Sequence, residues 1–238
     1  MRRVAFTVDV EQDAPPFMST WRGMEEGMPQ LLGLLQRHGV RATFFVTGIA
    51  ASRYPEVIAH IARSHEVGCH GYEHERFDRL SPDDQRARIL TATDVLQDIT
   101  GEKPAGFRAP NFRFNRHTLQ ILEEAGYIYD ASTARYHSSH RHTRSSLVQI
   151  ANTLPSSVLR LSPRFSRIAV DACLRCSPLA VLDHHPWELV RMSGLRLDIR
   201  FATGNEAFER LDSLLGWLLA GGVRFVTMRE VAAERTGH

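Results

Sequence analysis

Residues 28–47, MPQLLGLLQRHGVRATFFVT, join a helical pattern to a strand pattern through one glycine. The apolar residues of the first half recur at helical spacing, and Gly39 follows them as a stop signal. The second half, residues 41–47, is β-branched and aromatic, which is typical of a strand. Another strand candidate at residues 4–8 comes before this pair. The stretch therefore predicts a strand–helix–strand unit with parallel strands.

The same alternation continues along the chain. Further strands are expected at residues 66–71, 106–109, 127–130, 147–150, 158–161, 179–183 and 223–227. Further helices are expected at residues 55–63, 81–101, 115–124 and 205–220, and from residue 229 onward. Six to eight strands with interleaved helices and no linker predict a single α/β domain built as a closed or nearly closed barrel. An open doubly wound sheet is the alternative, but no glycine-rich nucleotide loop follows the first strand.

Composition narrows the class of protein. The 238 residues are 43% apolar and 24% charged, as in ordinary globular domains. Lys and Arg number 29 against 27 Asp and Glu, a net charge of +2, so nucleic acid is not expected as a partner. An odd count of 3 cysteines argues against a disulfide framework and for a reducing compartment. The start, MRRVAFTVDVEQD, lacks the apolar core of a signal peptide, so a cytoplasmic protein that begins at Met1 is expected.

Two polar clusters stand where predicted strands end, at the rim where parallel α/β folds bind ligands. In an extended segment residues i and i+2 point to one side, so Asp9 and Glu11 can share a site as base and metal ligand. They can equally be two solvated acids. His70 and His74 face the same way if their segment is helical, although such pairs also arise by chance. A carboxylate with two imidazoles leaves open positions on Zn²⁺ or Fe²⁺.

Two more clusters follow later strands. Arg108, two residues before Pro110, is placed to hold a carboxylate with its two parallel donors and so to orient a base, or to form an ordinary surface ion pair. His184 and His185 come after an apolar strand and before Pro186, where one of them can act as a general acid. Either can also be a satisfied core histidine. Side chains alternate along a strand, so only one of the two histidines can enter the groove.

The four clusters together resemble the metal-dependent polysaccharide deacetylases, also called the NodB-homology fold or carbohydrate esterase family four. The resemblance runs from Val4 to about Val231. The segments that carry it are TVDVE at 7–11, HGYEH at 70–74, FRAPNF at 107–112, YDAS at 129–132 and LDHHPWE at 182–188. The start of the chain looks more like the intracellular lipid-linked aminoarabinose deformylases than the secreted chitin or peptidoglycan enzymes.

The resemblance implies a distorted (β/α)7 barrel over residues 1–238 that hydrolyses an N-acyl group from an amino sugar. The roles it implies are Asp9 as general base, Glu11, His70 and His74 as metal ligands, Arg108 as the residue that orients Asp9, and His185 as general acid. It also implies a substrate groove lined by Pro110, Asn111, Phe112, Asp130 and Trp187. The commonest form of the first motif has adjacent aspartates, so Asp13 is an alternative to Glu11.

The implied cofactor is one divalent metal ion, expected to be zinc, with cobalt, nickel, iron or manganese as alternatives. The implied substrate is an N-acetyl or N-formyl amino sugar, free or attached to a lipid, phosphate or nucleotide, and the expected location is the cytoplasm or the inner face of the membrane. The run from Arg135 to Arg144, rich in histidine and arginine, either binds an anionic group or is a polar loop.

Two other functions fit the same residues. One is a non-catalytic sugar-binding protein of this fold, and the other is an allantoinase-like hydrolase of cyclic amides. Cys173 and Cys176 have the spacing of a zinc or redox pair, but no second pair accompanies them, so two half-buried thiols are expected. Cys69 is expected to be a small core residue.

Overall fold

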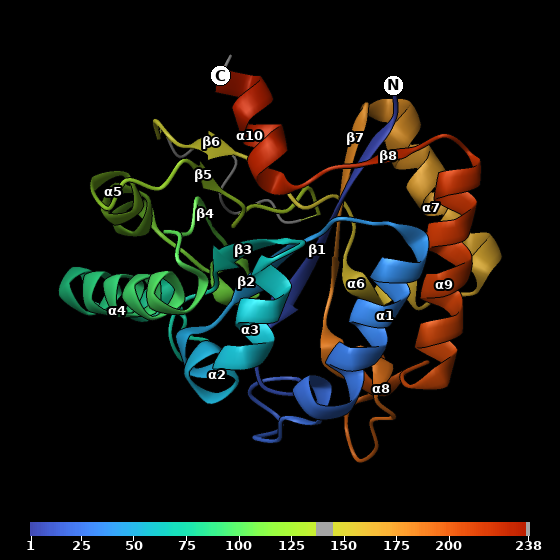
Figure 1. Ribbon diagram of the computed structural model, residues 1–238, viewed down its shortest axis with the longest axis horizontal. Helices are drawn as coiled ribbons and strands as arrows, with labels where there is room; N and C mark the ends of the chain where they lie inside the picture. The colour runs from blue at the N-terminus through green and yellow to red at the C-terminus, as the bar shows by residue number, and fades with distance from the viewer. Residues whose placement is uncertain (137–144, 237–238) are drawn as a thin grey trace. The chain divides into compact units, whose positions relative to one another are not determined.

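The computed structural model describes residues 1–136 and 145–236 (Figure 1). Helices alternate with strands along the chain, and the residues form two compact units. Unit 1 consists of residues 1–42 and 153–226, and unit 2 of the described residues in 43–152 and 227–238. Residues 137–144, which make up most of the histidine- and arginine-rich run, lie outside the described residues. That all 238 residues act as one catalytic domain stays a prediction.

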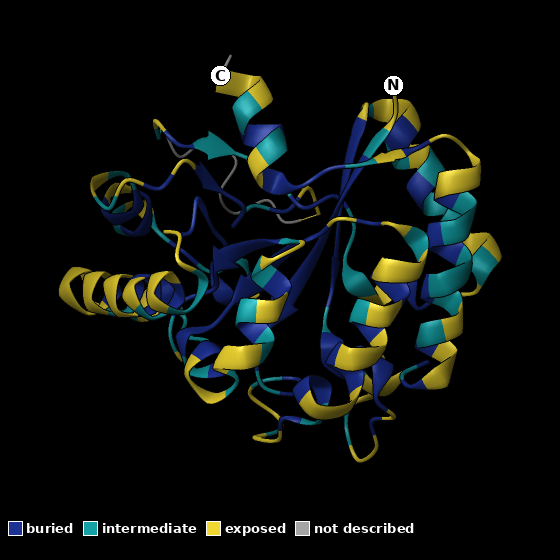
Figure 2. Cartoon of the chain, viewed as in Figure 1, coloured by how far each residue is buried: buried dark blue, intermediate teal, exposed yellow. Residues whose placement is uncertain are grey.

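Unit 1 contains a parallel sheet in which β1 (Arg3–Val10) pairs with both β7 (Leu179–His184) and β8 (Arg224–Phe225). All residues of β7 are buried, as are all of β1 after the first (Figure 2). Strands that are covered on both faces read as nearly continuous apolar runs, which is how both segments appear in the sequence. The parallel register places Thr7 opposite Asp183 and Val8 opposite His184, so the polar ends of the two strands coincide.

Three long helices of unit 1 lie side by side in Figure 1: α1 (Met28–His38), α9 (Asn205–Ala220) and α7 (Pro163–Cys176). Helix α1 ends at Gly39, whose φ of 62° is the left-handed conformation that favours glycine. The shorter elements are η1 (Gly23–Gly27, a π-helix), α6 (Ser156–Leu159), η4 (Pro186–Leu189) and α8 (Leu197–Arg200).

The strands of unit 2 are parallel and pair in the order β2 (Thr43–Val46), β3 (Glu66–Cys69), β4 (Gly106–Phe107), β5 (Tyr129–Asp130) and β6 (Val148–Gln149). Its helices are α2 (Gly48–Arg53), α3 (Pro55–Ala62), α4 (Pro82–Thr100), α5 (Arg116–Glu124) and α10 (Met228–Thr236), with η2 (Phe77–Arg79) and η3 (Pro110–Phe112) as short 3-10 turns. The predicted caps are present, since Ser81 accepts the backbone N–H of Asp84 and Asn115 forms a capping box on α5.

One predicted strand is wrong. Residues 158–161 were expected to be extended because Val158 and its neighbours are apolar, but Ser156–Leu159 form helix α6 after Pro155. Three helices, α2, α7 and α8, were not predicted at all. In α7 the buried residues do follow helical spacing, but Phe165 and Ile168 are 63% and 57% exposed on the other face and hide that pattern in the sequence. Cys173 is half-buried and Cys176 exposed on this helix, both as free thiols.

Candidate functional site

Three titratable side chains meet where β1 and β7 end in unit 1. Asp9, Asp183 and His185 each place one ligand atom so that the three atoms lie within 4.8 Å of one another. Asp9 and Asp183 are 5% and 4% exposed, whereas the side chain of His185 is 16% exposed. The parallel register of the strands explains this meeting, because it brings residue 9 level with residue 185 one step beyond the last paired residues.

The two acids after Asp9 have different surroundings. Asp13 is fully buried and accepts three hydrogen bonds, from the Thr20 hydroxyl at 2.6 Å and from the backbone N–H groups of Arg22 and Gly23 at 2.8 and 2.7 Å. Its carboxylate is therefore engaged in holding the loop that leads into η1. The Glu11 carboxylate instead lies 3.8 Å from Nε2 of His185.

Two glycines allow η1 to lie directly against η4, the turn that follows His185. A Cβ atom at Gly23 would lie only 2.6 Å from the backbone nitrogen of Trp187, and one at Gly27 would overlap the carbonyl of Pro186. Neither position has room for a side chain. The contact fixes the backbone just after His185.

Glu188 is a fully buried carboxylate that contacts both adjacent histidines. One of its oxygens lies 2.7 Å from Nδ1 of His184, and the other lies 3.5 Å from Nδ1 of His185. The second oxygen also accepts a hydrogen bond from the Ser156 hydroxyl at 2.7 Å and lies 3.4 Å from Nε of Arg160. One carboxylate thus fixes both imidazoles, and its own place is fixed by two further donors.

These contacts shift the pKa values of Glu188 and His185. Burial raises the pKa of Glu188, but His184, His185 and Arg160 more than offset this and hold it well below its usual value. Burial lowers the pKa of His185, but its contact with Glu188 and the charges of Glu11, Glu188 and Asp9 together raise it to about 10. The His185 ring also stacks on Trp187, with ring centroids 5.2 Å apart. The carboxylates around His185 thus favour its protonated form, as the role of a general acid requires.

His184 has a different environment from its neighbour. It is 1% exposed, its ring lies 6.1 Å from that of Phe6, and its Nδ1 faces Glu188. The structure thus places His184 in the wall of unit 1 and His185 at the partly open strand end.

Unit 2 brings the two histidines of the HGYEH segment together after β3. His70 is 1% exposed, and its Nδ1 lies 2.8 Å from the carbonyl oxygen of Arg108. A carbonyl only accepts hydrogen bonds, so Nδ1 carries the proton and Nε2 keeps a lone pair, the arrangement typical of metal-binding histidines. The ring of His74 lies 5.6 Å from that of His70. The segment is not helical as the spacing suggested, and His74 has a φ of 70°.

Arg108 is fully buried between aromatic rings of unit 2. Its guanidinium carbon lies 4.3 Å from the ring centre of Phe45 and 5.7 Å from that of Phe112. Asn111 and Phe112 both have a φ of 54°, which turns the chain sharply after the buried Pro110. Cation–π contacts and this turn fix the guanidinium in one position.

Asp130 is fully buried at the end of β5. One oxygen accepts hydrogen bonds from the backbone N–H and the hydroxyl of Ser132. Burial raises its pKa to about 6, although Ser132 and Arg108 act in the opposite direction. This carboxyl stabilises the loop after β5, which shapes the wall of unit 2.

Three residues around His185 escaped the sequence analysis: Ser156, Arg160 and Glu188. Glu188 stands in the LDHHPWE segment, and its place three residues after His185 was a usable signal. Arg160 and Ser156 had none, because Arg160 belongs to a segment that was expected to be a strand and Ser156 comes just before it.

Comparison with known proteins identifies the family. The model of the polysaccharide deacetylase family matches residues 2–129. A peptidoglycan deacetylase of Helicobacter pylori is 31% identical over 144 residues, which are 54% of this chain and 48% of that protein. The chain spans about half the length of the curated relatives it matches.

Solved structures show the same fold over nearly the whole chain. The structure of Puue allantoinase has a TM-score of 0.75 at 18% identity and covers 97% of this chain and 88% of its own. A peptidoglycan N-acetylglucosamine deacetylase has a TM-score of 0.67 at 22% identity and covers 96% and 86%. The predicted α/β fold of the NodB-homology type is confirmed. By its matched sequence model and its fold, the chain belongs to the polysaccharide deacetylase family.

Proposed function

We propose that the protein is a metal-dependent amide hydrolase that removes an N-acyl group from an amino sugar. The observation that carries the proposal is the strand-end cluster of unit 1, in which ligand atoms of Asp9, Asp183 and His185 lie within 4.8 Å of one another. Hydrolysis of an amide needs a base for the attacking water and an acid for the departing nitrogen. Asp9 and His185 are the two residues that supply them.

We assign the metal to Glu11, His70 and His74. Because the proton of His70 lies on Nδ1, the lone pair of Nε2 is available to bind the metal. The Asp13 carboxylate already accepts three hydrogen bonds within its loop, which favours Glu11 as the carboxylate ligand. One carboxylate and two imidazoles suit zinc, and also iron or cobalt. When bound, the ion would lower the pKa of a coordinated water and polarise the amide carbonyl.

The proton transfers then fall to the residues of the chain. Asp9 accepts the proton of the attacking water, and Arg108 orients Asp9. His185 donates its proton to the amide nitrogen, because that nitrogen is a poor leaving group until it is protonated. Glu188 keeps the His185 ring in place through Nδ1, which leaves Nε2 as the donating atom.

The groove residues and the finer substrate are part of the same proposal. We assign substrate contacts to Pro110, Asn111, Phe112, Asp130 and Trp187. Among these, Asn111 is exposed, whereas Asp130 and Trp187 are buried and act by shaping the wall. The relative named as a peptidoglycan deacetylase supports an N-acetyl substrate, and the lipid-linked deformylase resemblance of the first residues supports an N-formyl sugar.

The proposed location is the cytoplasm or the inner face of the membrane. Within residues 1–136 and 145–236, no helix has the length and apolar character of a membrane span.

The test is a panel of N-acetyl and N-formyl amino sugars, each free and phosphorylated, incubated with the metal-loaded protein and analysed by liquid chromatography with mass detection. Allantoin is included as a cyclic amide, and Asp9→Asn serves as control. We expect a free amine with acetate or formate from at least one sugar, and none from the variant. Turnover of allantoin alone would favour the allantoinase-like function. Binding of sugars without turnover would favour the non-catalytic one.

A further inference from the structure

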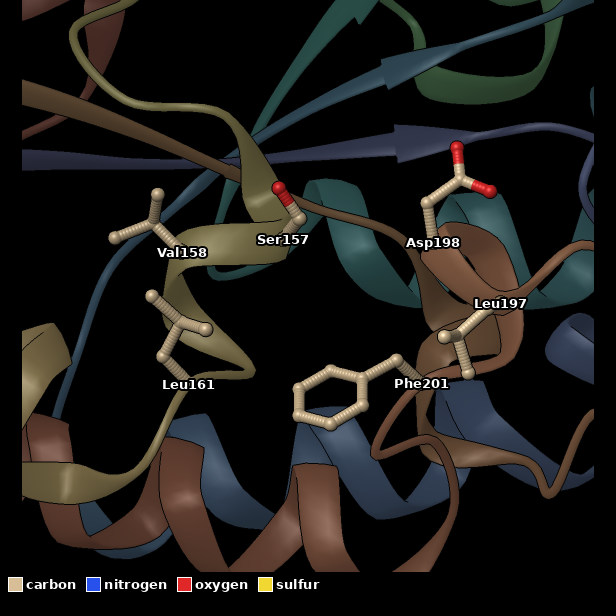
Figure 3. A pocket seen from close by; sticks show the side chains of 6 residues that line it. All are labelled: Ser157, Val158, Leu161, Leu197, Asp198 and Phe201. Atoms are coloured by element: carbon tan, nitrogen blue, oxygen red, sulfur yellow. The ribbon is translucent and has the colours of Figure 1, made fainter.

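Helix α8 of unit 1 has a hollow on each side, and the two differ in chemistry. The first, about 470 Å³, is an apolar groove in which Leu161 of one wall faces Leu197 and Phe201 of the other (Figure 3). The second, about 570 Å³, is lined largely by charged and polar residues between η4 and the start of α9. Its lining includes three arginines, Arg22, Arg191 and Arg200, as well as Thr203, Gly204 and Asn205.

Hydrogen bonds fix the walls of the polar hollow. The backbone N–H of Met192 donates to the Thr203 hydroxyl at 3.0 Å, and that of Gly204 donates to the carbonyl of Glu188 at 2.9 Å. Gly204 has a φ of 79°, and a Cβ atom there would lie 3.2 Å from the backbone nitrogen of Arg191. Glycine at this position thus lets α9 begin close to Arg191. The walls of the hollow are therefore fixed by hydrogen bonds, and one of these joins Gly204 to the backbone of Glu188.

The charges around the hollow are not balanced. Arg22 forms an ion pair with Glu26, and Glu206 forms one with Arg210, so both acids in the lining are already neutralised. Among the described residues, no carboxylate lies within 4.0 Å of the guanidinium of Arg191 or of Arg200. Two positive charges at the rim therefore have no counter-charge within 4.0 Å among the residues that the structure describes.

The start of α9 adds donors of its own. The first N–H groups of a helix have no acceptor within the helix, and α9 has no side-chain cap. These groups and the positive end of the helix dipole favour an anion next to the two arginines.

We propose that this hollow binds a phosphate group. A phosphate monoester carries between one and two negative charges near neutral pH, which matches the two unneutralised arginines better than the single charge of a carboxylate does. Arginine also binds phosphate through two parallel donors. The group is either part of the sugar substrate or free phosphate. The first of these sources rests on the proposed function, because Gly204 of the hollow is hydrogen-bonded to the backbone of Glu188, whose side chain contacts His185.

The test measures binding without turnover. Isothermal titration at constant ionic strength uses inorganic phosphate, N-acetylglucosamine 1-phosphate and, as uncharged control, N-acetylglucosamine. Arg191→Gln and Arg200→Gln are each expected to weaken phosphate binding about tenfold, and the double variant about a hundredfold. Both side chains are exposed and lack ion pairs, so the variants should keep the wild-type melting temperature. Arg196→Gln is the matched control, since Arg196 lies on the same segment but pairs with Asp198.

The outcomes separate the proposal from the proposed function. Tighter binding of the phosphorylated sugar than of inorganic phosphate would identify the substrate as the source, and equal binding would identify free phosphate. Absence of phosphate binding by the wild type, or equal binding by the double variant, would overturn the site. Neither readout depends on amide hydrolysis, so an inactive protein could still confirm the hollow and an active one could still refute it.

Discussion

Glu66 in unit 2 and Glu188 in unit 1 are both buried carboxylates with several donors, but their donors differ in charge. Glu66 accepts hydrogen bonds from the hydroxyls of Thr43 and Tyr129, both at 2.7 Å, and from the backbone N–H of Arg229 at 2.9 Å. Glu188 is bound by two imidazoles and a guanidinium. Burial therefore dominates at Glu66 and raises its pKa, whereas the cationic partners of Glu188 lower its pKa.

The two glutamates also occupy opposite ends of their strands. Glu66 is the first residue of β3, where its bonds tie that strand to β2, β5 and α10. Glu188 follows the carboxyl end of β7 beside His185. In folds of parallel strands, polar residues at the amino ends serve stability and those at the carboxyl ends serve chemistry. Burial and hydrogen bonding alone therefore do not identify a functional carboxylate; the charge of its partners and the strand end where it lies distinguish Glu188 from Glu66.

The largest effect is expected from Asp9→Asn at the carboxyl end of β1. Because the substitution removes the proposed base and keeps the side-chain shape, kcat should fall on the order of 10²–10⁴-fold while the metal is retained. Steady-state kinetics and elemental analysis of the same preparation measure both. Loss of metal from this variant, with metal kept in Glu11→Gln, would mean that the two roles must be exchanged.

Glu188→Gln is expected to lower kcat of the folded protein about 10–100-fold, because His185 loses the carboxylate that orients it. Ser156→Ala is the matched control. It removes one hydrogen bond to Glu188 but leaves the charge, so kcat should stay near that of the wild type. Partial recovery in Glu188→Asp would support a positioning role. If Glu188→Gln kept the kcat of the wild type, Glu188 would have only a structural role, like Glu66.

Glu66→Gln is expected to act on stability alone. An amide cannot accept hydrogen bonds at both ends, so at least one buried donor loses its partner and the free energy of unfolding falls by about 1–3 kcal/mol. Urea denaturation measures this loss, and kcat of the folded fraction should not change. A fall in kcat comparable with that of Glu188→Gln would break the comparison between the two ends.

A pH dependence of stability is expected from Asp130, whose pKa burial raises to about 6. A raised pKa means that the folded state binds more protons than the unfolded state between about pH 4 and pH 6, so Asp130 lowers stability as the pH rises through that window. Relative to Asp130→Asn, the wild type should lose up to about 3 kcal/mol of unfolding free energy across it. Urea denaturation at pH 4 and pH 7 compares the two proteins. The same change in unfolding free energy in both would count against a raised pKa of Asp130.

Much of the fold could be predicted because the signals were local. Ser81, Asn115 and Gly39 mark helix ends through their own hydrogen bonds or backbone conformation, and all three act as predicted. Helix α7 could not be predicted, because apolar residues lie on both of its faces and Phe165 and Ile168 hide the buried stripe.

The proposed catalytic residues could be predicted from the sequence, but the residues that hold them in place could not. Asp9 and His185 follow strand patterns, so the end of the strand could be read from the sequence. Arg160 reaches Glu188 from a helix 28 positions earlier in the chain, and no periodicity connects two such residues. Contacts of that kind depend on packing, which a single sequence does not display.

The metal content of variants tests whether Glu11, His70 and His74 hold the ion. Removing one of three ligands should lower the metal affinity at least 10–100-fold, because mutation of residues that only hydrogen-bond to the ligands already lowers it that much. Elemental analysis after dialysis compares His74→Ala with Asp9→Asn and with His60→Ala, an exposed histidine on α3. We expect His74→Ala to contain no metal, while the other two variants keep about one equivalent. Stoichiometric metal in His74→Ala would contradict this assignment.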